Sequence, residues 1–411
     1  MNNKKLLLPL LALTPCSLFA GETLPITEEK TEWFKFSVEA RARIEQRNQQ
    51  GADNSWAGTF RIRPGFYLGK DEGFAAFVQT EHTLAFIDDY QVGSPQSAQF
   101  TPHTPGNTAI SDPENNELNQ LYAQYKGHGA LARVGRQRLI YDNAAFIGNV
   151  GWRQNEQTLD AGLLDYKKEA FQFKYAYANR VNRIFGSDAS GAVKALEGDA
   201  HLLNGSYKFK EHKFTGYAYL MDFSEQQFKR ASNNTFGGSF DFSLPRGNLH
   251  TELAYQTEAG NQAEYEDVYG HVYYGNKVND FSYNFGVEYI GKDFVTPLAT
   301  VHAFNGFADL FIADRLGLTA GPAQWDGLTD MYASVGTKIP GGVALKGFVH
   351  GFFDKDVDQF YGLEFDVVAA KKLSDELKAV VKYAYFFGDN DATNKFDNNV
   401  AQFSVELNYT F

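Results

Sequence analysis

Residues 33–46 read WFKFSVEARARIEQ, and the alternation in this stretch decides the fold. One set of alternate positions is apolar, namely Phe34, Phe36, Val38, Ala40, Ala42 and Ile44. The other set is charged or polar, namely Lys35, Ser37, Glu39, Arg41, Arg43 and Glu45. A period of two residues indicates a β-strand with one apolar and one hydrated face, because an amphipathic helix would repeat every 3.6 residues. Strands of soluble sandwiches alternate too, but they are usually only about 5–6 residues long.

Alternating segments of this kind recur 18 times between residue 33 and the last residue, 411. Their connections are alternately short and long, and the long ones include residues 87–116, 140–156, 181–198, 291–326 and 388–398. Short turns at one end and long loops at the other are typical of outer-membrane barrels. A bilayer offers the backbone no hydrogen-bond partners, so a sheet crosses it only when it is closed. We therefore predict an all-β fold, a transmembrane antiparallel up-and-down β-barrel of 18 strands over residues 33–411, with 16 strands as the alternative.

The composition excludes several other classes of protein. The 411 residues include 50 acidic and 38 basic ones, for a net charge of -12, and the mean hydropathy is -0.39. Beyond residue 20, no stretch approaches the roughly 18 apolar residues that a membrane-spanning helix needs. No run of Lys and Arg forms a phosphate-binding stripe, so nucleic acid is not expected as a partner.

The first 20 residues resemble a secretory signal peptide. Two lysines at positions 4 and 5 precede the apolar run LLLPLLAL at 6–13, and Leu18-Phe19-Ala20 resembles a signal-peptidase site. A basic start, a short apolar core and a small residue before the cut define such signals. We therefore expect a signal peptide at 1–20 and a short periplasmic segment at 21–32.

The single cysteine, Cys16, lies within this signal. A lipoprotein anchored at Cys16 is the alternative to a cleaved signal peptide, but Pro15 directly before the cysteine argues against lipidation. After cleavage the mature chain has no cysteine, so a disulfide, a thiol nucleophile and a Cys-ligated metal are not expected.

The last predicted strand, 399–411, ends in an aromatic residue. Its apolar positions, Ala401, Phe403, Val405, Leu407, Tyr409 and Phe411, share one face. A terminal aromatic on the lipid face resembles the signal that the outer-membrane barrel assembly machinery reads, and an ordinary amphipathic edge strand is the alternative. We expect the outer membrane of a Gram-negative-type bacterium as the location, with lipid and lipopolysaccharide around the barrel.

Three stretches resemble the alginate-export family of outer-membrane barrels. They are GRQRLIYDNAAFIGNVGWRQNEQTLDA at 135–161, TPLATVHAFNGFADLF at 296–311 with GLTDMYASV at 327–335, and YGLEFDVVAAKKLSDELKAVVKYAYFFGD at 361–389. The resemblance implies an 18-stranded monomeric pore, in agreement with the strand count, and passage of a polysaccharide or another solute. Fold-level resemblance does not identify the cargo.

Side-chain parity indicates which charged residues face the lumen. The hydrated face of the first half of the barrel is basic, with Arg41, Arg43, Arg61, Arg63, Arg133, Lys174 and Arg180. The hydrated face of the second half is acidic, with Asp222, Asp241, Glu252, Glu288, Glu364, Asp366 and Glu406. This mixed lumen departs from the strongly basic lumen that the resemblance implies for an exporter of the polyanion alginate.

The first two strands form a hairpin that carries four of these arginines, Arg41, Arg43, Arg61 and Arg63. Adjacent strands lie about 5 Å apart, so the guanidiniums are close together. Because guanidiniums bind carboxylates in two-point contacts, the cluster is expected to guide anionic groups. A salt-bridge network that braces the wall is the alternative, and both roles are compatible. The acidic face is interpreted either as a wall that orients cations or dipolar solutes or as a merely hydrated surface.

Two histidines draw attention. His302 lies in HAFNGFADLF within the long 291–326 loop, whose aromatic and apolar content is too high for a solvated tip. We expect a packed loop motif that folds into the pore and narrows it. His350 shares a strand face with Lys346, Phe348 and Phe352. The sequence leaves open whether these rings meet sugars in the lumen or lipid outside.

No GxSxG, Walker, GxGxxG or HExxH sequence is present, so an enzyme, a cofactor and a metal centre are not expected. We expect a passive pore for polar or anionic solutes such as oligosaccharides, uronates or small organic anions, which pass through weak successive contacts. The alternatives are a general diffusion porin with little selectivity, an exporter of a secreted polysaccharide, and a hydrolase built on a surface barrel.

Overall fold

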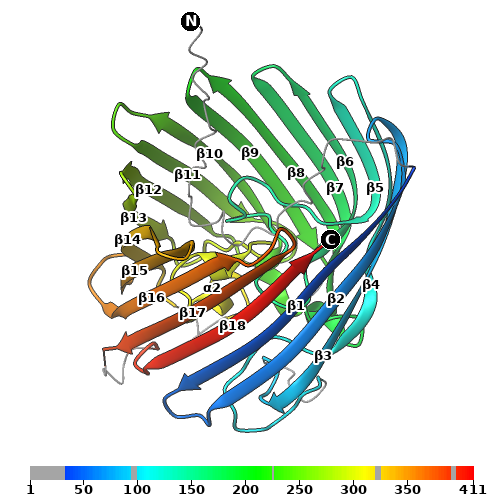
Figure 1. Cartoon of the computed structure of the whole chain (residues 1–411). Helices are drawn as coiled ribbons and strands as arrows, with labels where there is room; N and C mark the ends of the chain where they lie inside the picture. The colour runs from blue at the N-terminus through cyan, green and yellow to red at the C-terminus, as the bar shows by residue number, and fades with distance from the viewer. Residues whose placement is uncertain (1–32, 94–99, 225, 320–324, 390–394) are drawn as a thin grey trace, which may run out of the picture.

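The computed structural model describes residues 33–93, 100–224, 226–319, 325–389 and 395–411. The expected signal peptide at 1–20 and segment at 21–32 lie outside the described residues. The described chain forms an 18-stranded sheet that closes on itself, because β1 pairs with β18 as well as with β2 (Figure 1). Every strand is antiparallel to both neighbours, so the predicted barrel of 18 strands is confirmed.

The first nine strands carry the first half of the wall. They are β1 (Phe34–Gln49), β2 (Ser55–Gly69), β3 (Gly73–Asp89), β4 (Asn115–Gly127), β5 (Ala130–Gln137), β6 (Thr158–Lys168), β7 (Phe171–Asn182), β8 (Ala195–Phe209) and β9 (His212–Phe223). The second half comprises β10 (Asn233–Ser243), β11 (Asn248–Glu258), β12 (Glu266–Val278), β13 (Phe281–Ile290), β14 (Leu328–Ile339), β15 (Val343–Phe353), β16 (Phe360–Lys372), β17 (Leu377–Gly388) and β18 (Val400–Thr410).

The connections are short at the end of the barrel where the chain enters β1 and leaves β18. For example, two residues join β4 to β5, whereas residues 90–114, 138–157 and 291–327 connect strands at the opposite end. In the described parts of the loops, the helical segments are short, namely α1 (Gly191–Lys194), η3 (Gln226–Ala231), η4 (Val301–Ala303) and α2 (Ile312–Arg315). Among the described residues, no helix is long and apolar enough to cross a bilayer.

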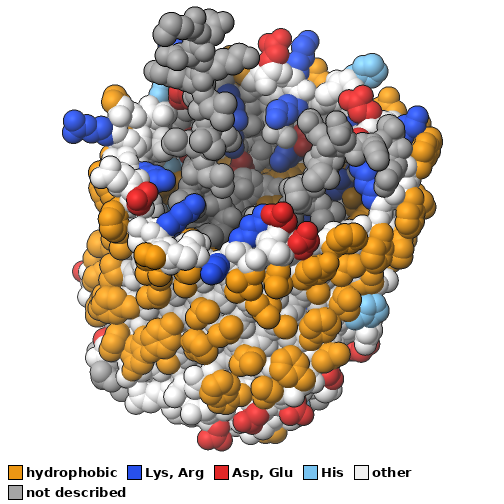
Figure 2. Space-filling model, viewed as in Figure 1, with side chains coloured by type: hydrophobic (Ala, Val, Ile, Leu, Met, Phe, Trp, Pro, Cys, Tyr) orange, Lys and Arg blue, Asp and Glu red, His pale blue; other side chains and the backbone are white. Residues whose placement is uncertain are grey.

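The outward face of the strands is apolar. On β1, Phe34 and Phe36 are exposed, and the same face of β18 exposes Leu407 and, just beyond the strand, Phe411, which is 63% exposed. Figure 2 shows a belt of hydrophobic side chains around the visible wall, with charged side chains above and below it. An outward apolar band of this kind is the surface that lipid covers in outer-membrane barrels.

Two long connections, the 138–157 loop and the 291–327 loop, fold into the barrel and pack against each other. Gly148 N donates to Leu298 O at 2.8 Å, and Thr300 N donates to Ala144 O at 3.0 Å. Phe146 of the first loop packs on luminal Tyr217 and Tyr269, with ring centroids 5.1 and 5.2 Å apart. In Figure 1 the yellow segment that carries α2 lies inside the ring of strands. The expectation that the 291–326 loop folds inward is confirmed.

Candidate functional site

The lumen has two charged walls. We name Arg41 and Arg43 of β1 with Arg61 and Arg63 of β2 the arginine wall. The carboxylate wall comprises Glu252 of β11, Glu288 of β13, Asp330 of β14, and Glu364 and Asp366 of β16. All of these side chains point inward and are buried, except Arg41, which is partly buried. Each wall is covered by one of the two inward loops.

Backbone carbonyls of the 138–157 loop cover the β1 part of the arginine wall. Arg41 Nη1 donates to the carbonyl oxygens of Gly151, Trp152 and Arg153 at 3.0, 2.9 and 3.2 Å. Arg43 also donates to the Trp152 carbonyl, and its guanidinium lies 3.0 Å from Asp112. The loop thus presents its partial negative charges to fixed positive charges.

The two β2 arginines have different partners. Arg63 pairs with Glu81 of β3 and lies 3.3 Å from Glu39 of β1. Arg61 donates to a single carbonyl, that of Gln154, at 3.2 Å. Within the described part of the chain, Arg61 has no ion-pair partner, and its Nε has no hydrogen-bond partner. A guanidinium carries five donors, so Arg61 keeps most of its donor capacity.

Glu156 links the two ends of the 138–157 loop through hydrogen bonds. Arg138 Nε and Nη2 each lie 2.6 Å from a Glu156 carboxylate oxygen, and Asn149 Nδ2 donates to the same group at 2.7 Å. Burial alone would raise the pKa of Glu156, but the nearby guanidiniums of Arg138 and Arg63 hold it well below its usual range. The carboxylate is therefore ionised at neutral pH.

Trp152 joins the two loops. Its ring stacks on His302 of the 291–327 loop, with centroids 4.1 Å apart and planes within 4°. Lys382 Nζ of β17 lies 3.4 Å from the Trp152 centroid and 2.9 Å from His302 Nε2. His302 Nδ1 lies 2.7 Å from Asp309. Burial lowers the pKa of His302 to about 3, so the ring is neutral, donates through Nδ1 and accepts from Lys382 at Nε2. The prediction of a packed loop motif is confirmed.

Amide groups and one arginine of the 291–327 loop cover the carboxylate wall. Asn305 Nδ2 donates to Glu288 at 2.6 Å, and Arg315 lies 3.1 Å from the same carboxylate. The backbone N–H of Ala308 donates to Glu364 Oε1 at 2.8 Å. Gly306, at φ +81°, lets the loop approach so closely that a Cβ there would lie 2.5 Å from Glu364 Cδ.

The remaining basic residues predicted from parity divide into two groups. Arg133 faces the lumen, where its guanidinium lies 4.1 Å from the Tyr122 centroid, and Lys174 lies 5.2 Å from the Tyr141 ring. The prediction for Arg180 is wrong, because a bulge between Ala178 and Arg180 reverses the parity. Arg180 faces outward and pairs there with Glu197.

The acidic predictions are placed in the same way. Asp241 and Glu406 face the lumen, as do the four other acids on β11, β13 and β16. The prediction for Asp222 is wrong, since its neighbours Met221 and Phe223 point inward and Asp222 is exposed on the outer face. The inner face of β9 is apolar at this end, because Tyr219, Met221 and Phe223 are buried in the hydrophobic core, so polarity does not mark the luminal side there.

The open question about β15 is answered by burial. Phe348, Phe352, His350 and Lys346 all point inward. Lys346 Nζ lies 4.4 Å from the Phe348 ring centroid. Aromatic rings therefore line the lumen beside the carboxylate wall.

Several residues of this site were not predicted from the sequence. Asp112, Trp152 and Glu156 lie in loops, where side-chain parity gives no information. Lys382 and His250 lie on luminal strand faces, and parity of β17 and β11 would have identified them.

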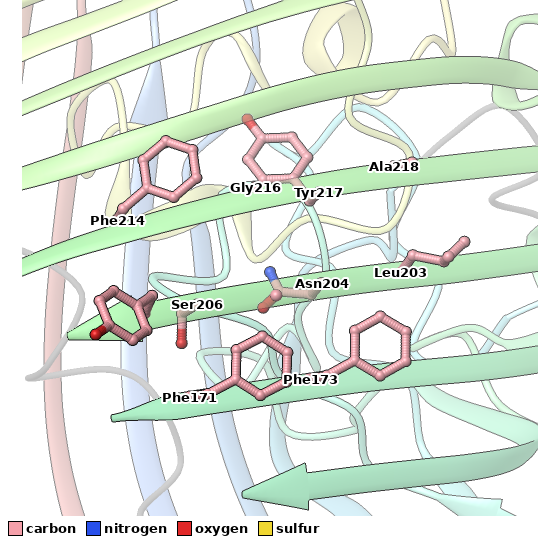
Figure 3. A pocket seen from close by; sticks show the side chains of 11 residues that line it. Phe171, Phe173, Leu203, Asn204, Ser206, Phe214, Gly216, Tyr217 and Ala218 are labelled. Atoms are coloured by element: carbon pink, nitrogen blue, oxygen red, sulfur yellow. The ribbon is translucent and has the colours of Figure 1, made fainter. Parts of the chain in front are cut away.

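An apolar depression lies on the outer surface of β7–β9 and is separate from the lumen (Figure 3). Its floor is formed by Gly205 and Gly216, which pair directly, and exposed Phe171, Phe173 and Phe214 surround them. These rings belong to the lipid-facing belt. The depression is therefore not part of a solute path.

Comparison with known proteins gives a partial match to one family model and a fold. A family model described as alginate export matches residues 32–183. This match confirms the resemblance and includes the first of the three stretches quoted for it. No curated protein sequence matches the chain.

Solved structures of outer-membrane channels have the same fold at low sequence identity. Pseudomonas aeruginosa OccK9 (OpdG) is 13% identical, with a TM-score of 0.66 over 93% of this chain and 100% of that one. Acinetobacter baumannii OccAB1 is 11% identical, with a TM-score of 0.67 over 93% and 97%. The P. aeruginosa outer membrane protein OpdK is 9% identical, with a TM-score of 0.64 over 92% and 99%, and a further OpdK structure contains vanillate. The protein is thus an outer-membrane β-barrel with the fold of a channel, as predicted.

Proposed function

We propose that this barrel is a channel through which small anionic or polar solutes diffuse across the outer membrane, with the arginine wall as the site that contacts them. The observation that carries the proposal is the state of Arg61. Its buried guanidinium is met by one backbone carbonyl and by no carboxylate among the described residues. A charged group with unused donors in a lumen supports transient binding of a carboxylate.

Carboxylate-bearing solutes such as uronates, acidic oligosaccharides and small organic acids fit this chemistry. The Tyr122 ring already carries a guanidinium on its face, because Arg133 lies 4.1 Å from its centroid. Sugar or aromatic faces suit such surfaces, and the vanillate in the OpdK structure is a carboxylate on an aromatic ring. Weak contacts of this kind allow a solute to leave as well as to enter.

The two inward loops favour small solutes over a polymer. The 138–157 and 291–327 loops are hydrogen-bonded to each other across the lumen, and Arg153 lies 3.1 Å from Asp309 between them. A chain of sugars would have to displace this joined pair. Export of a polysaccharide is nevertheless the second candidate, because the alginate-export family model matches residues 32–183.

The proposal is tested by ion selectivity in planar bilayers. The wild-type pore should prefer anions in a salt gradient, and Arg61→Gln should shift the reversal potential toward cation preference. Arg180→Gln is the matched control, because it removes the same charge from the outer face. Unchanged reversal potential in Arg61→Gln, or an equal shift in the control, would remove the arginine wall from the mechanism.

Two predictions about partners follow from the sequence alone. The assembly machinery is proposed to read the C-terminal aromatic residue, and the channel is proposed to act as a monomer. Cross-linking in membranes checks the second of these.

A further inference from the structure

A cluster of two histidines and one glutamate faces the lumen on β11 and β12. His250 and Glu252 lie two residues apart on β11, and Glu252 pairs directly with His271 of β12. All three side chains are at least nine-tenths buried. One ligand atom from each residue lies within 4.8 Å of the others. Two imidazoles and a carboxylate are a ligand set that proteins use for zinc.

Two buried imidazole nitrogens in this cluster have no hydrogen-bond partner in the described part of the chain. They are His250 Nε2 and His271 Nδ1. His250 Nε2 lies 3.6 Å from Glu252 Oε2, which is too long for a hydrogen bond. Buried polar atoms are normally satisfied, and an unpaired one calls for an explanation such as an ion. A shared metal ion would satisfy both nitrogens and the carboxylate at once.

The other polar atom of each side chain is held by a neighbour. His250 Nδ1 lies 2.7 Å from Asp241 of β10, and His271 Nε2 lies 2.8 Å from the Tyr332 hydroxyl of β14. The Tyr217 hydroxyl donates to Glu252 Oε1 at 2.9 Å. Such partners fix the tautomer and orientation of metal ligands, and a carboxylate behind a histidine is the commonest arrangement.

We propose that His250, Glu252 and His271 bind a zinc-class divalent cation through His250 Nε2, Glu252 Oε2 and His271 Nδ1. Zinc–ligand distances of about 2.0–2.1 Å place two ligand atoms of a tetrahedron about 3.3 Å apart. The 3.6 Å between the His250 and Glu252 atoms is close to this value, and a ligand atom of His271 lies within 4.8 Å of a ligand atom of each of these two residues.

Space for a fourth ligand lies beside the cluster. A cavity of about 30 Å³ is lined by His271, Glu288, Asp330 and His350, among others. This is enough for a water molecule. The bound ion would link β11 to β12 and place a fixed positive charge beside the carboxylate wall.

Metal binding is measured on the full chain, purified in detergent without a histidine tag and stripped with a chelator. We expect one Zn²⁺ per chain by calorimetry, and Co²⁺ should give the visible absorption of a tetrahedral site with nitrogen ligands. His271→Gln removes the Nδ1 ligand but keeps an amide near Tyr332. His250→Asn removes the Nε2 ligand but keeps an amide near Asp241. Each should weaken Zn²⁺ binding at least 10-fold, and Asp241→Asn should weaken it by about 10–100-fold.

Two controls make the result decisive. His201→Gln removes a histidine on the outer face, where it lies 2.9 Å from the Tyr175 hydroxyl, and should leave affinity unchanged. Asp354→Asn alters the acidic group Asp326, Asp354 and Asp356 at the loop end and should also leave it unchanged. Circular dichroism confirms that each variant folds. Absence of Zn²⁺ binding in the wild type would overturn the proposal. So would binding that survives in both His250→Asn and His271→Gln, or that is lost in Asp354→Asn.

Discussion

The arginine wall and the carboxylate wall differ in charge, and the two loops that cover them differ in the same way. The 138–157 loop presents the carbonyl oxygens of residues 151–154 to guanidiniums. The 291–327 loop presents the Asn305 amide, the Ala308 N–H and the Arg315 guanidinium to carboxylates. In both places an inward loop supplies the complement of the wall it covers.

This comparison explains how a charged lumen tolerates two buried loops. An unpaired charge is costly to bury, whereas a paired and hydrogen-bonded one is tolerated. The 291–327 loop satisfies Glu288 with several donors, but Arg61 on the opposite wall has only the Gln154 carbonyl. Within the described part of the chain, the unused donors therefore lie on the arginine side, where we place the anionic solute, whereas Glu364 and Asp366 leave acceptors unused on the other wall.

The largest expected effect comes from removing one guanidinium on each side. Arg315→Met leaves Glu288 without its guanidinium, and removal of one partner of a buried pair costs about 3–5 kcal/mol. Hydrogen exchange should show faster opening of the 291–327 loop. Arg138→Met breaks the contacts to Glu39 of β1 and to Glu156 and should open the 138–157 loop.

The two variants together also test whether the two loops open separately. If each loop is held by its own wall, each variant loosens mainly its own loop. Equal loss of protection in both loops, from either variant, would show instead that the loops open as one unit. No change in either loop would contradict the role given to these ion pairs.

A smaller loss of stability is expected from Gly306→Ala. Its positive φ disfavours a side chain by about 1–2 kcal/mol, and a Cβ would also overlap the Glu364 carboxylate, at a further cost of about 1–3 kcal/mol. Gly51→Ala is the matched control, since Gly51 has φ +89° but nothing within 4 Å. Chemical unfolding in lipid vesicles compares the two. Equal destabilisation would mean that the loop does not rest on Glu364.

The smallest effect concerns pH. The pKa of His302 falls from 6.5 to about 3 on burial, so its contribution to loop docking is complete above pH 6.5 and is lost as pH falls toward 3. At pH 5 the loss is on the order of 2 kcal/mol. Asp309, whose pKa is lowered although burial opposes it, acts in the same direction at lower pH. Single-channel conductance should therefore rise on acidification to pH 5, and less so in His302→Asn. Identical pH profiles would contradict this account.

Much of the wall was predictable from the sequence, because alternation fixes which side of a strand a residue faces. The four arginines of β1 and β2 and the acids of β11, β13 and β16 were placed correctly in this way. Parity failed at Arg180, where an extra residue in the strand reverses it, and at Asp222, where the inner face of β9 is apolar.

The contacts of the loops could not be predicted. The arginine wall is covered by backbone carbonyls. Every residue type has a carbonyl, so no pattern of side chains in the sequence predicts these contacts. Gly306 lies against the Glu364 carboxylate, and these two positions are far apart in the sequence, so only the fold brings them together. Aromatic content did indicate that the 291–327 loop is packed, but not which wall it covers.

The most direct test of the central claim is the block of single-channel current by glucuronate in three proteins. We predict block in the wild type and in Glu364→Gln, which keeps the acceptor for the Ala308 N–H, and at least 10-fold weaker block in Arg61→Gln. Equal block in all three proteins, or weaker block in Glu364→Gln than in Arg61→Gln, would contradict the assignment of the solute to the arginine wall.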